Sequence, residues 1–240
     1  QKSVMKEVCK RLQIDTKVHK EKAILAAISS AKDELITPEQ FLMNAGDDLG
    51  QQRIGKAYAE YQAMLKKNNA LDFDDLIVKT IELFRLQPEV LGYYQERFRY
   101  IMVDEYQDTN TAQFTFVSLL ANKYQNLCVV GDDDQSIYKF RGANIGNILN
   151  FEDKYRDAKV IKLEQNYRST GNILDAANAV IANNRGRKRK RLWTENAQGD
   201  KIRMRQVATA FEEADFIAHD IQEKMNDGVH ESYRQFACLY

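Results

Sequence analysis

The sequence predicts an α/β protein whose N-terminal part is entirely helical. Two observations lead to this fold class. Apolar residues recur at helical spacing over residues 1–69, and short, unbroken apolar runs then alternate with helical segments over the rest of the chain. A third observation bears on function, because polar residues follow directly after several of these apolar runs.

The N-terminal part shows its helices through periodicity and one start signal. Val4, Val8 and Leu12 share one helical face. The run Thr37-Pro38-Glu39-Gln40 places a capping hydroxyl before a proline and ends in a glutamine at the third helical position, as in a capping box. We expect a loop at residues 47–50 and a further helix over residues 57–67.

The middle of the chain carries the signature of a parallel sheet. Predominantly apolar runs at residues 100–103, 127–130 and 160–163 are separated by helical patterns. A strand that is apolar on both faces is typical of a buried parallel sheet. Such sheets bind ligands beyond the carboxyl ends of their strands. Toward the C-terminus we expect helices at 173–181 and 212–225 and strands at 202–207 and 236–240.

Composition limits the class of protein without defining it. The 240 residues are 44% hydrophobic, which is enough for a sizeable core, and 35 basic residues balance 35 acidic ones. No apolar run approaches the ~20 residues of a membrane helix. The cysteines show no paired spacing, so we do not expect a structural zinc site. We expect instead a reducing, cytoplasmic location. The cysteines are Cys9, Cys128 and Cys238.

Two adjacent carboxylates end the first predicted strand. Asp104 and Glu105 follow residues 100–103 directly, an arrangement that suits a magnesium-nucleotide site. One carboxylate would hold hydrated Mg²⁺ and the other would orient and deprotonate a water molecule. Since neighbouring residues of a strand point to opposite sides, the pair can share a site only where the strand ends and the backbone turns. Taken alone, such a pair is structural or incidental as often as it is functional.

Three longer segments supply the context for this pair. Residues 104–110, 131–143 and 163–170 resemble, in the same order, three signature motifs of superfamily 1 DNA helicases of the UvrD/Rep/PcrA type. The resemblance continues more faintly through residues 71–76, 192–196 and 237–240.

This resemblance implies a RecA-like parallel sheet, as found in the lobes of P-loop NTPases, with an N-terminal all-helical insertion. Residues 1–69 would be the insertion, 70–166 the remainder of the first motor lobe and 167–240 the start of the second. It further implies ATP as substrate, Mg²⁺ as cofactor, single-stranded and duplex DNA as partners, and movement from 3′ to 5′.

The resemblance also assigns roles to individual residues. Asp104 would bind Mg²⁺ and Glu105 would activate water, while Gln135 and Arg168 would contact the γ-phosphate, the arginine from the second lobe. Tyr167 would stack on adenine. The segment that links the nucleotide to single-stranded DNA would comprise Tyr138, Phe140 and Arg141. Many close relatives carry tryptophan where this chain has Phe140. Without the surrounding motif, Tyr138 and Phe140 would be interpreted as core aromatics.

A phosphate-binding loop is not expected within these residues. Residues 50–56 fit the first seven positions of the P-loop pattern, but Ala57 replaces the hydroxyl residue that should bind magnesium, and no apolar strand precedes Gly50. By resemblance, the true P-loop would precede residue 1. We therefore expect the 240 residues alone to be catalytically silent.

Other charged clusters have simpler interpretations. The acidic residues at 132–134 and at 72, 74 and 75 lack the spacing of a calcium loop and fit turns and helix starts better. The basic run at 185–191 would either meet DNA phosphates, which the helicase resemblance favours, or form a solvated loop. Two other functional classes remain open at this stage: a subunit of a helicase-nuclease and a non-hydrolysing DNA-binding homologue.

Overall fold

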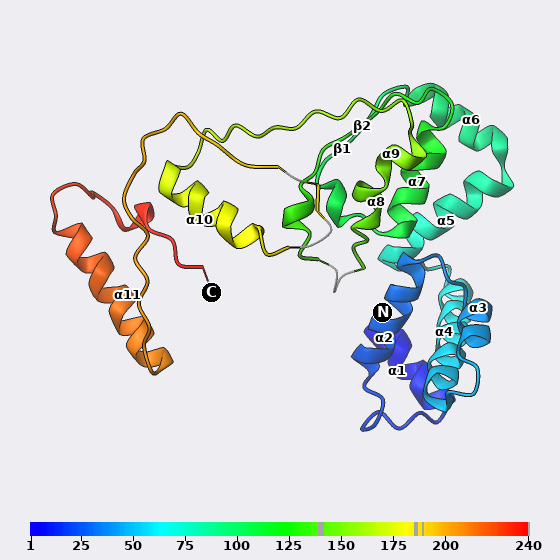
Figure 1. Ribbon diagram of the computed structural model, residues 1–240. Coiled ribbons are helices and arrows are strands. Elements are labelled where there is room, and N and C mark those ends of the chain that lie inside the picture. Colours follow the sequence, from blue (N-terminus) through cyan, green and yellow to red (C-terminus); the bar gives the residue numbers. More distant parts are fainter. Residues whose placement is uncertain (139–141, 185–186, 189, 240) are drawn as a thin grey trace. The chain divides into compact units, whose positions relative to one another are not determined.

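The computed structural model (Figure 1) describes residues 1–138, 142–184, 187–188 and 190–239. The chain forms two compact units. Unit 1 comprises residues 1–162 and 181–190, and unit 2 comprises residues 163–180 and 191–240. No helix in the described part of the chain is both long and apolar enough to cross a membrane.

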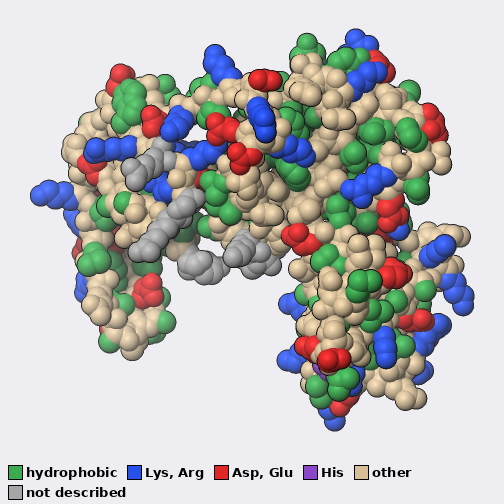
Figure 2. Space-filling model, turned by 45° about the vertical axis from the view of Figure 1, so that its right-hand side comes forward, with side chains coloured by type: hydrophobic (Ala, Val, Ile, Leu, Met, Phe, Trp, Pro, Cys, Tyr) green, Lys and Arg blue, Asp and Glu red, His purple; other side chains and the backbone are tan. Residues whose placement is uncertain are grey.

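Unit 1 begins with a helical module. Its helices are α1 (Lys2–Arg11), α2 (Glu21–Asp33), α3 (Pro38–Asn44) and α4 (Leu49–Lys67). Their apolar faces enclose one core, which includes Met5, Ile24, Ile28 and Tyr61. Lys and Arg side chains lie among Asp and Glu side chains on the visible surface of this module (Figure 2), as is typical of a solvated face.

The helix starts in this module follow the capping chemistry of the sequence. The Thr37 hydroxyl accepts a hydrogen bond from the Gln40 backbone N–H, and the Gln40 side chain accepts one from the Thr37 N–H, so the predicted capping box is confirmed. The loop expected at 47–50 ends earlier than predicted. Asp48 caps α4 by accepting from the N–H groups of Gly50 and Gln51, so the helix already begins at Leu49.

The remainder of unit 1 alternates helices with short strands. In chain order it contains α5 (Phe73–Leu86), α6 (Pro88–Arg97), β1 (Ile101–Val103), the 3₁₀ turn Tyr106–Asp108, α7 (Thr111–Ala121), β2 (Leu127–Val129), the 3₁₀ turn Asp133–Gln135, α8 (Gly146–Leu149) and α9 (Phe151–Lys154). Strands β1 and β2 are parallel, with Ile101 opposite Leu127 and Val103 opposite Val129 (Figure 1). The predicted alternation and the parallel pairing of the first two strands are confirmed.

Unit 2 contains α10 (Gly171–Ile181) except for its last residue, α11 (Ala210–Met225) and the 3₁₀ turn Tyr233–Gln235. The strands expected at 160–163, 202–207 and 236–240 are wrong for the described residues, which form no ladder there. A strand requires a hydrogen-bonded neighbour as well as an apolar sequence, and the described part of these segments pairs with none. One isolated bridge joins Gln165 and Trp193 in parallel.

A buried ion network joins three helices of unit 1. The Lys32 ammonium on α2 lies 2.6 Å from an Asp72 carboxylate oxygen and 2.9 Å from one of Asp75. The Tyr61 hydroxyl on α4 donates to Asp72 at 3.1 Å. Burial alone would raise the pKa of Asp72, but the bonds from Lys32, the Asp75 N–H and Tyr61 outweigh it and lower that pKa. Asp72 and Asp75 also form the capping box of α5, which confirms the predicted helix-start role of these two.

We predict that Lys32→Met lowers the free energy of unfolding by about 3–5 kcal/mol, because two carboxylates would be left buried without their counterion. Urea unfolding followed by circular dichroism measures this change. Lys79→Met is the matched control, since Lys79 pairs with Glu82 on the exposed face of α5, and its loss should cost at most about 0.5 kcal/mol. Equal effects of the two substitutions would contradict the prediction.

Candidate functional site

The chain turns sharply where β1 ends. Glu105 has a φ of +49°, in the left-handed region, and its N–H donates to the Asp104 carboxylate at 2.9 Å. Both side chains are exposed. The condition set by the sequence is thus met, because the strand has ended and the backbone turns at the acidic pair. The strained turn frees Asp104 and Glu105 from the alternation of a strand.

One buried amide connects this turn to the end of β2. The Gln107 side chain donates to a Glu105 carboxylate oxygen at 2.8 Å and accepts from the Asp132 N–H at 3.0 Å. A Cβ on Gly131 would lie 2.6 Å from the Gln107 amide oxygen and 3.2 Å from the Tyr106 nitrogen, so glycine is needed there. Sequence reasoning named no role for Gln107. The signal available was a glutamine two positions after the acidic pair.

Gln135 lies in the turn that follows β2. Its amide donates to an Asp132 carboxylate oxygen at 2.8 Å, and the other oxygen of Asp132 accepts from the Asp134 N–H at 3.0 Å. Because β1 and β2 are parallel and in register, the turns after both strands lie at the same edge. The structure therefore brings Asp104, Glu105 and Gln135 to one edge of the strand pair.

The acidic triplet after β2 is matched by basic residues from the segment 187–190. The carboxylates of Asp132, Asp133 and Asp134 lie within 4.8 Å of one another, close enough to hold a metal ion. The Lys190 ammonium contacts all three, including Asp133 at 3.1 Å and Asp134 at 3.3 Å. The Lys190 ammonium thus occupies the centre of the triplet and offsets part of its negative charge.

Two neighbours of Lys190 bind the same turn. The Arg187 guanidinium makes two bonds to Asp134, at 2.7 and 2.5 Å, and the Lys188 backbone N–H donates to Asp133 at 2.7 Å. The Lys188 side chain pairs instead with Glu152. The sequence left two interpretations of the basic run, contact with DNA phosphates or a solvated loop, and neither fits Arg187. Its side chain is only 16% exposed and is paired with Asp134. Residues 185, 186 and 189 of the run lie outside the described residues.

Tyr167 and Arg168 belong to unit 2, where side-chain amides hold their backbone. The Asn166 carboxamide oxygen accepts from the N–H groups of Arg168 and Ser169, at 2.9 and 2.7 Å. The Asn196 amide donates to the carbonyls of Tyr167 and Ser169. Both candidate side chains are exposed on this ordered turn, Tyr167 by 79%.

The remaining candidates are only partly described. Tyr138 is 36% exposed and therefore does not belong to the buried core of unit 1. Phe140 and Arg141, which were expected to act with it, lie outside the described residues.

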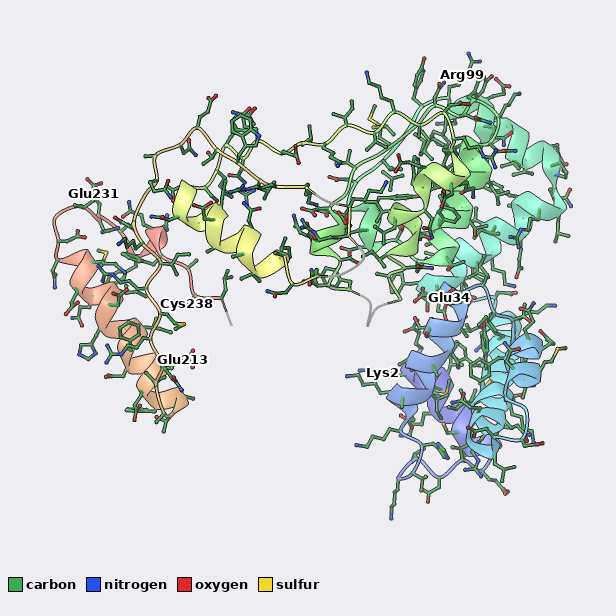
Figure 3. The ribbon with its side chains drawn as sticks, in the orientation of Figure 1. Lys2, Glu34, Arg99, Glu213, Glu231 and Cys238 are labelled. Carbon is green, nitrogen blue, oxygen red and sulfur yellow. The ribbon has the colours of Figure 1, made fainter. Side chains whose placement is uncertain are left out.

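The helical module is attached close to this site. The side chain of Asn110, which caps α7, donates to the Asp33 carboxylate at 2.6 Å, and the Thr111 hydroxyl donates to Glu34 at 2.7 Å. Figure 3 shows Glu34 at the end of α2, where the module meets the rest of unit 1. Burial, together with the nearby charges of Asp74 and Glu34, raises the pKa of Asp33 to about 6.

Comparison with known proteins identifies the family of the chain. Residues 1–156 match the family model of the UvrD/REP helicase N-terminal domain, and residues 161–240 match that of the UvrD-like helicase C-terminal domain. The chain therefore belongs to the UvrD/Rep helicase family.

Individual relatives are similar over the whole chain. The ATP-dependent DNA helicase PcrA of Staphylococcus epidermidis is 53% identical over all 240 residues, that of Staphylococcus aureus 52% and that of Leuconostoc citreum 50%. The chain spans 32% of the length of each of these relatives.

The raised pKa of Asp33 gives a pH-dependent prediction for stability. The ordinary value of 3.8 applies to the unfolded chain, so between about pH 4 and 6 the folded protein binds more protons than the unfolded one. Stability contributed by Asp33 is therefore lost as the pH rises through 6. Asp33→Asn should raise the free energy of unfolding at pH 7.5 by about 1 kcal/mol, after discounting for partial exposure, and change little at pH 4.

Urea unfolding at the two pH values measures this difference. Asp47→Asn, at an exposed position between α3 and α4, is the matched control and should change stability at neither pH. Destabilisation by Asp33→Asn at pH 7.5 would show instead that the charged Asp33 is favoured by its bond with Asn110.

Proposed function

We propose that the protein carrying this chain is an ATP-dependent DNA helicase that couples the hydrolysis of Mg-ATP to movement on single-stranded DNA in the 3′ to 5′ direction. One observation carries the proposal. The turns that follow β1 and β2 are joined by the Gln107 side chain, which connects Glu105 to the segment bearing Gln135. The family match supports it, as does the similarity to relatives that are named ATP-dependent DNA helicases.

The residues of this edge suit the proposed chemistry. Exposed carboxylate oxygens are the ligands that Mg²⁺ prefers, and Asp104 would provide one of them. Bound Mg²⁺ would neutralise charge on the phosphates. Glu105 would orient the attacking water and accept its proton, with the carboxylate held by the Gln107 amide. Gln135 would contact the γ-phosphate.

By the family resemblance, the second motor lobe would supply the other contacts to ATP. Arg168 would place a planar guanidinium on the γ-phosphate, and the exposed Tyr167 ring would stack on adenine. Their ordered backbone favours this assignment because it reduces the entropy lost on binding. Tyr138, with Phe140 and Arg141, would link the nucleotide to single-stranded DNA by stacking on bases.

The division of the chain into motor parts belongs to the same proposal. Residues 1–69 would be a helical insertion, 70–166 the remainder of a first RecA-like lobe and 167–240 the start of a second. The parallel pairing of β1 and β2 with intervening α7 supports a RecA-like sheet. Duplex DNA as a further partner and a cytoplasmic location, in which the free thiols Cys9, Cys128 and Cys238 would persist, complete it.

We predict that Glu105→Gln in the full-length protein reduces kcat for DNA-stimulated ATP hydrolysis by roughly 100- to 10,000-fold, because an amide cannot accept the proton of water. Nucleotide affinity should change little, since the Gln side chain retains an oxygen that can accept from Gln107. Phosphate release and equilibrium binding of a fluorescent ATP analogue measure the two quantities. Glu89→Gln, at an exposed position on α6, is the matched control, and near-normal turnover of Glu105→Gln would refute the assignment.

The 240 residues alone should neither bind nor hydrolyse ATP. The P-loop-like run at 50–56 lies inside α4, where the N–H groups of Gly50 and Gln51 already bind Asp48 and so do not cradle a phosphate. We predict no binding of Mg-ATP tighter than about 1 mM by titration calorimetry, and background phosphate release with single-stranded DNA. Micromolar affinity would mean that another part of these residues anchors the phosphates.

A further inference from the structure

A continuous chain of hydrogen bonds leads from Lys190 to Gln135. The Lys190 ammonium binds one carboxylate oxygen of Asp132, and the other oxygen of Asp132 accepts from the Gln135 amide at 2.8 Å. Gln135 lies in the 3₁₀ turn that Asp132 caps, and the bond to Asp132 holds the otherwise exposed Gln135 side chain against that turn. A shift of Asp132 would therefore move the acceptor to which the Gln135 amide is bound.

Asp132 depends on Lys190 for its own position. Asp132, Asp133 and Asp134 are consecutive, and their carboxylates crowd within 4.8 Å, where like charges repel. Lys190 contacts all three and is 17% exposed, so its charge is only partly screened by water. Removal of this ammonium would leave the repulsion within the triplet opposed mainly by Arg187, which binds only Asp134 of the three.

The ionisation of these groups agrees with the geometry. Burial opposes the charge of Asp132, but the bonds from Lys190 and Gln135 outweigh it and lower the pKa of Asp132. Burial likewise opposes the charge of Lys190, and its bonds to Asp132 and Asp133 outweigh it and raise the pKa of Lys190. Both groups are charged at neutral pH, so the link between them is an ion pair.

We propose that Lys190 is a positioning residue for Gln135: by offsetting charge in the acidic triplet it fixes Asp132, and through Asp132 it holds the Gln135 amide where the γ-phosphate is to be contacted. The inference rests on the proposed role of Gln135 in ATP hydrolysis. Lys190 itself touches no reacting atom. Lys190 lies in unit 1, as do the three aspartates and Gln135.

The test compares two lysines of the same segment in the full-length protein. Lys190→Met removes the ammonium from the triplet, whereas Lys188→Met removes a charge that pairs with Glu152 and leaves the Lys188 backbone bond to Asp133 in place. DNA-stimulated kcat should fall roughly 10- to 100-fold in Lys190→Met, as expected for a misplaced catalytic contact, with KM for ATP and single-strand affinity nearly unchanged. Lys188→Met should behave like the unmodified protein.

Two further variants separate positioning from folding. Lys190→Arg keeps the positive charge and should restore most of the lost kcat. In a Gln135→Ala background, Lys190→Met should cause no further loss, because the residue through which it acts is gone. Additive losses, a Lys190→Arg as impaired as Lys190→Met, or equal loss of single-strand affinity in the Lys188 and Lys190 variants would overturn the proposal.

The same variants distinguish this inference from the function on which it rests. If Gln135→Ala leaves turnover unchanged, the proposed role of Gln135 at the γ-phosphate fails. If Gln135→Ala impairs turnover and Lys190→Met does not, the role of Gln135 stands and that of Lys190 is refuted.

Discussion

The in-register parallel pairing of β1 and β2 is the constraint on which the candidate site depends. Each strand contributes only three residues, yet the pairing brings two turns that are more than twenty residues apart in sequence to one edge. The backbone continues the pairing beyond the strands, because the Val130 N–H donates to the Val103 carbonyl and the Tyr106 N–H donates to the Val130 carbonyl. The side-chain bonds of Gln107 are possible only within this framework.

Around this edge, hydrogen bonds from polar side chains join segments that are not paired as strands. Asn147 donates to the backbone carbonyls of Thr109 and Asn110, and Asn110 both caps α7 and binds Asp33 of the helical module. Asparagine and glutamine suit such junctions because one amide donates and accepts at once. These bonds attach the irregular segment before α7 to α8 and to the helical module.

Much of this arrangement could be predicted from local sequence patterns. The capping box at Thr37, the strand ends at Asp104 and Gly131 and the exclusion of residues 50–56 all follow from residues within a few positions of one another. The strands expected at 160–163 and 202–207 did not form. An apolar run indicates that a segment can form a strand, but it does not indicate whether a neighbouring segment will pair with it. The pairing of Lys190 with the acidic triplet could not be predicted either, because Lys190 and Asp132 lie 58 residues apart in sequence. No feature of the sequence near a basic run indicates which carboxylates it will bind.

At Glu105, the backbone conformation and the proposed catalytic role favour different residues. Among the described residues, the other non-glycine positions with positive φ are Gln13, Leu35, Asn69 and Gln125, and each lies just beyond the end of a helix, where a left-handed residue is ordinary. Glu105 alone of these follows a strand. Glycine or asparagine would adopt its conformation more readily. Selection for stability alone would therefore favour glycine at this position, and the persistence of a carboxylate there among homologues would measure how strongly the proposed catalytic role opposes that preference.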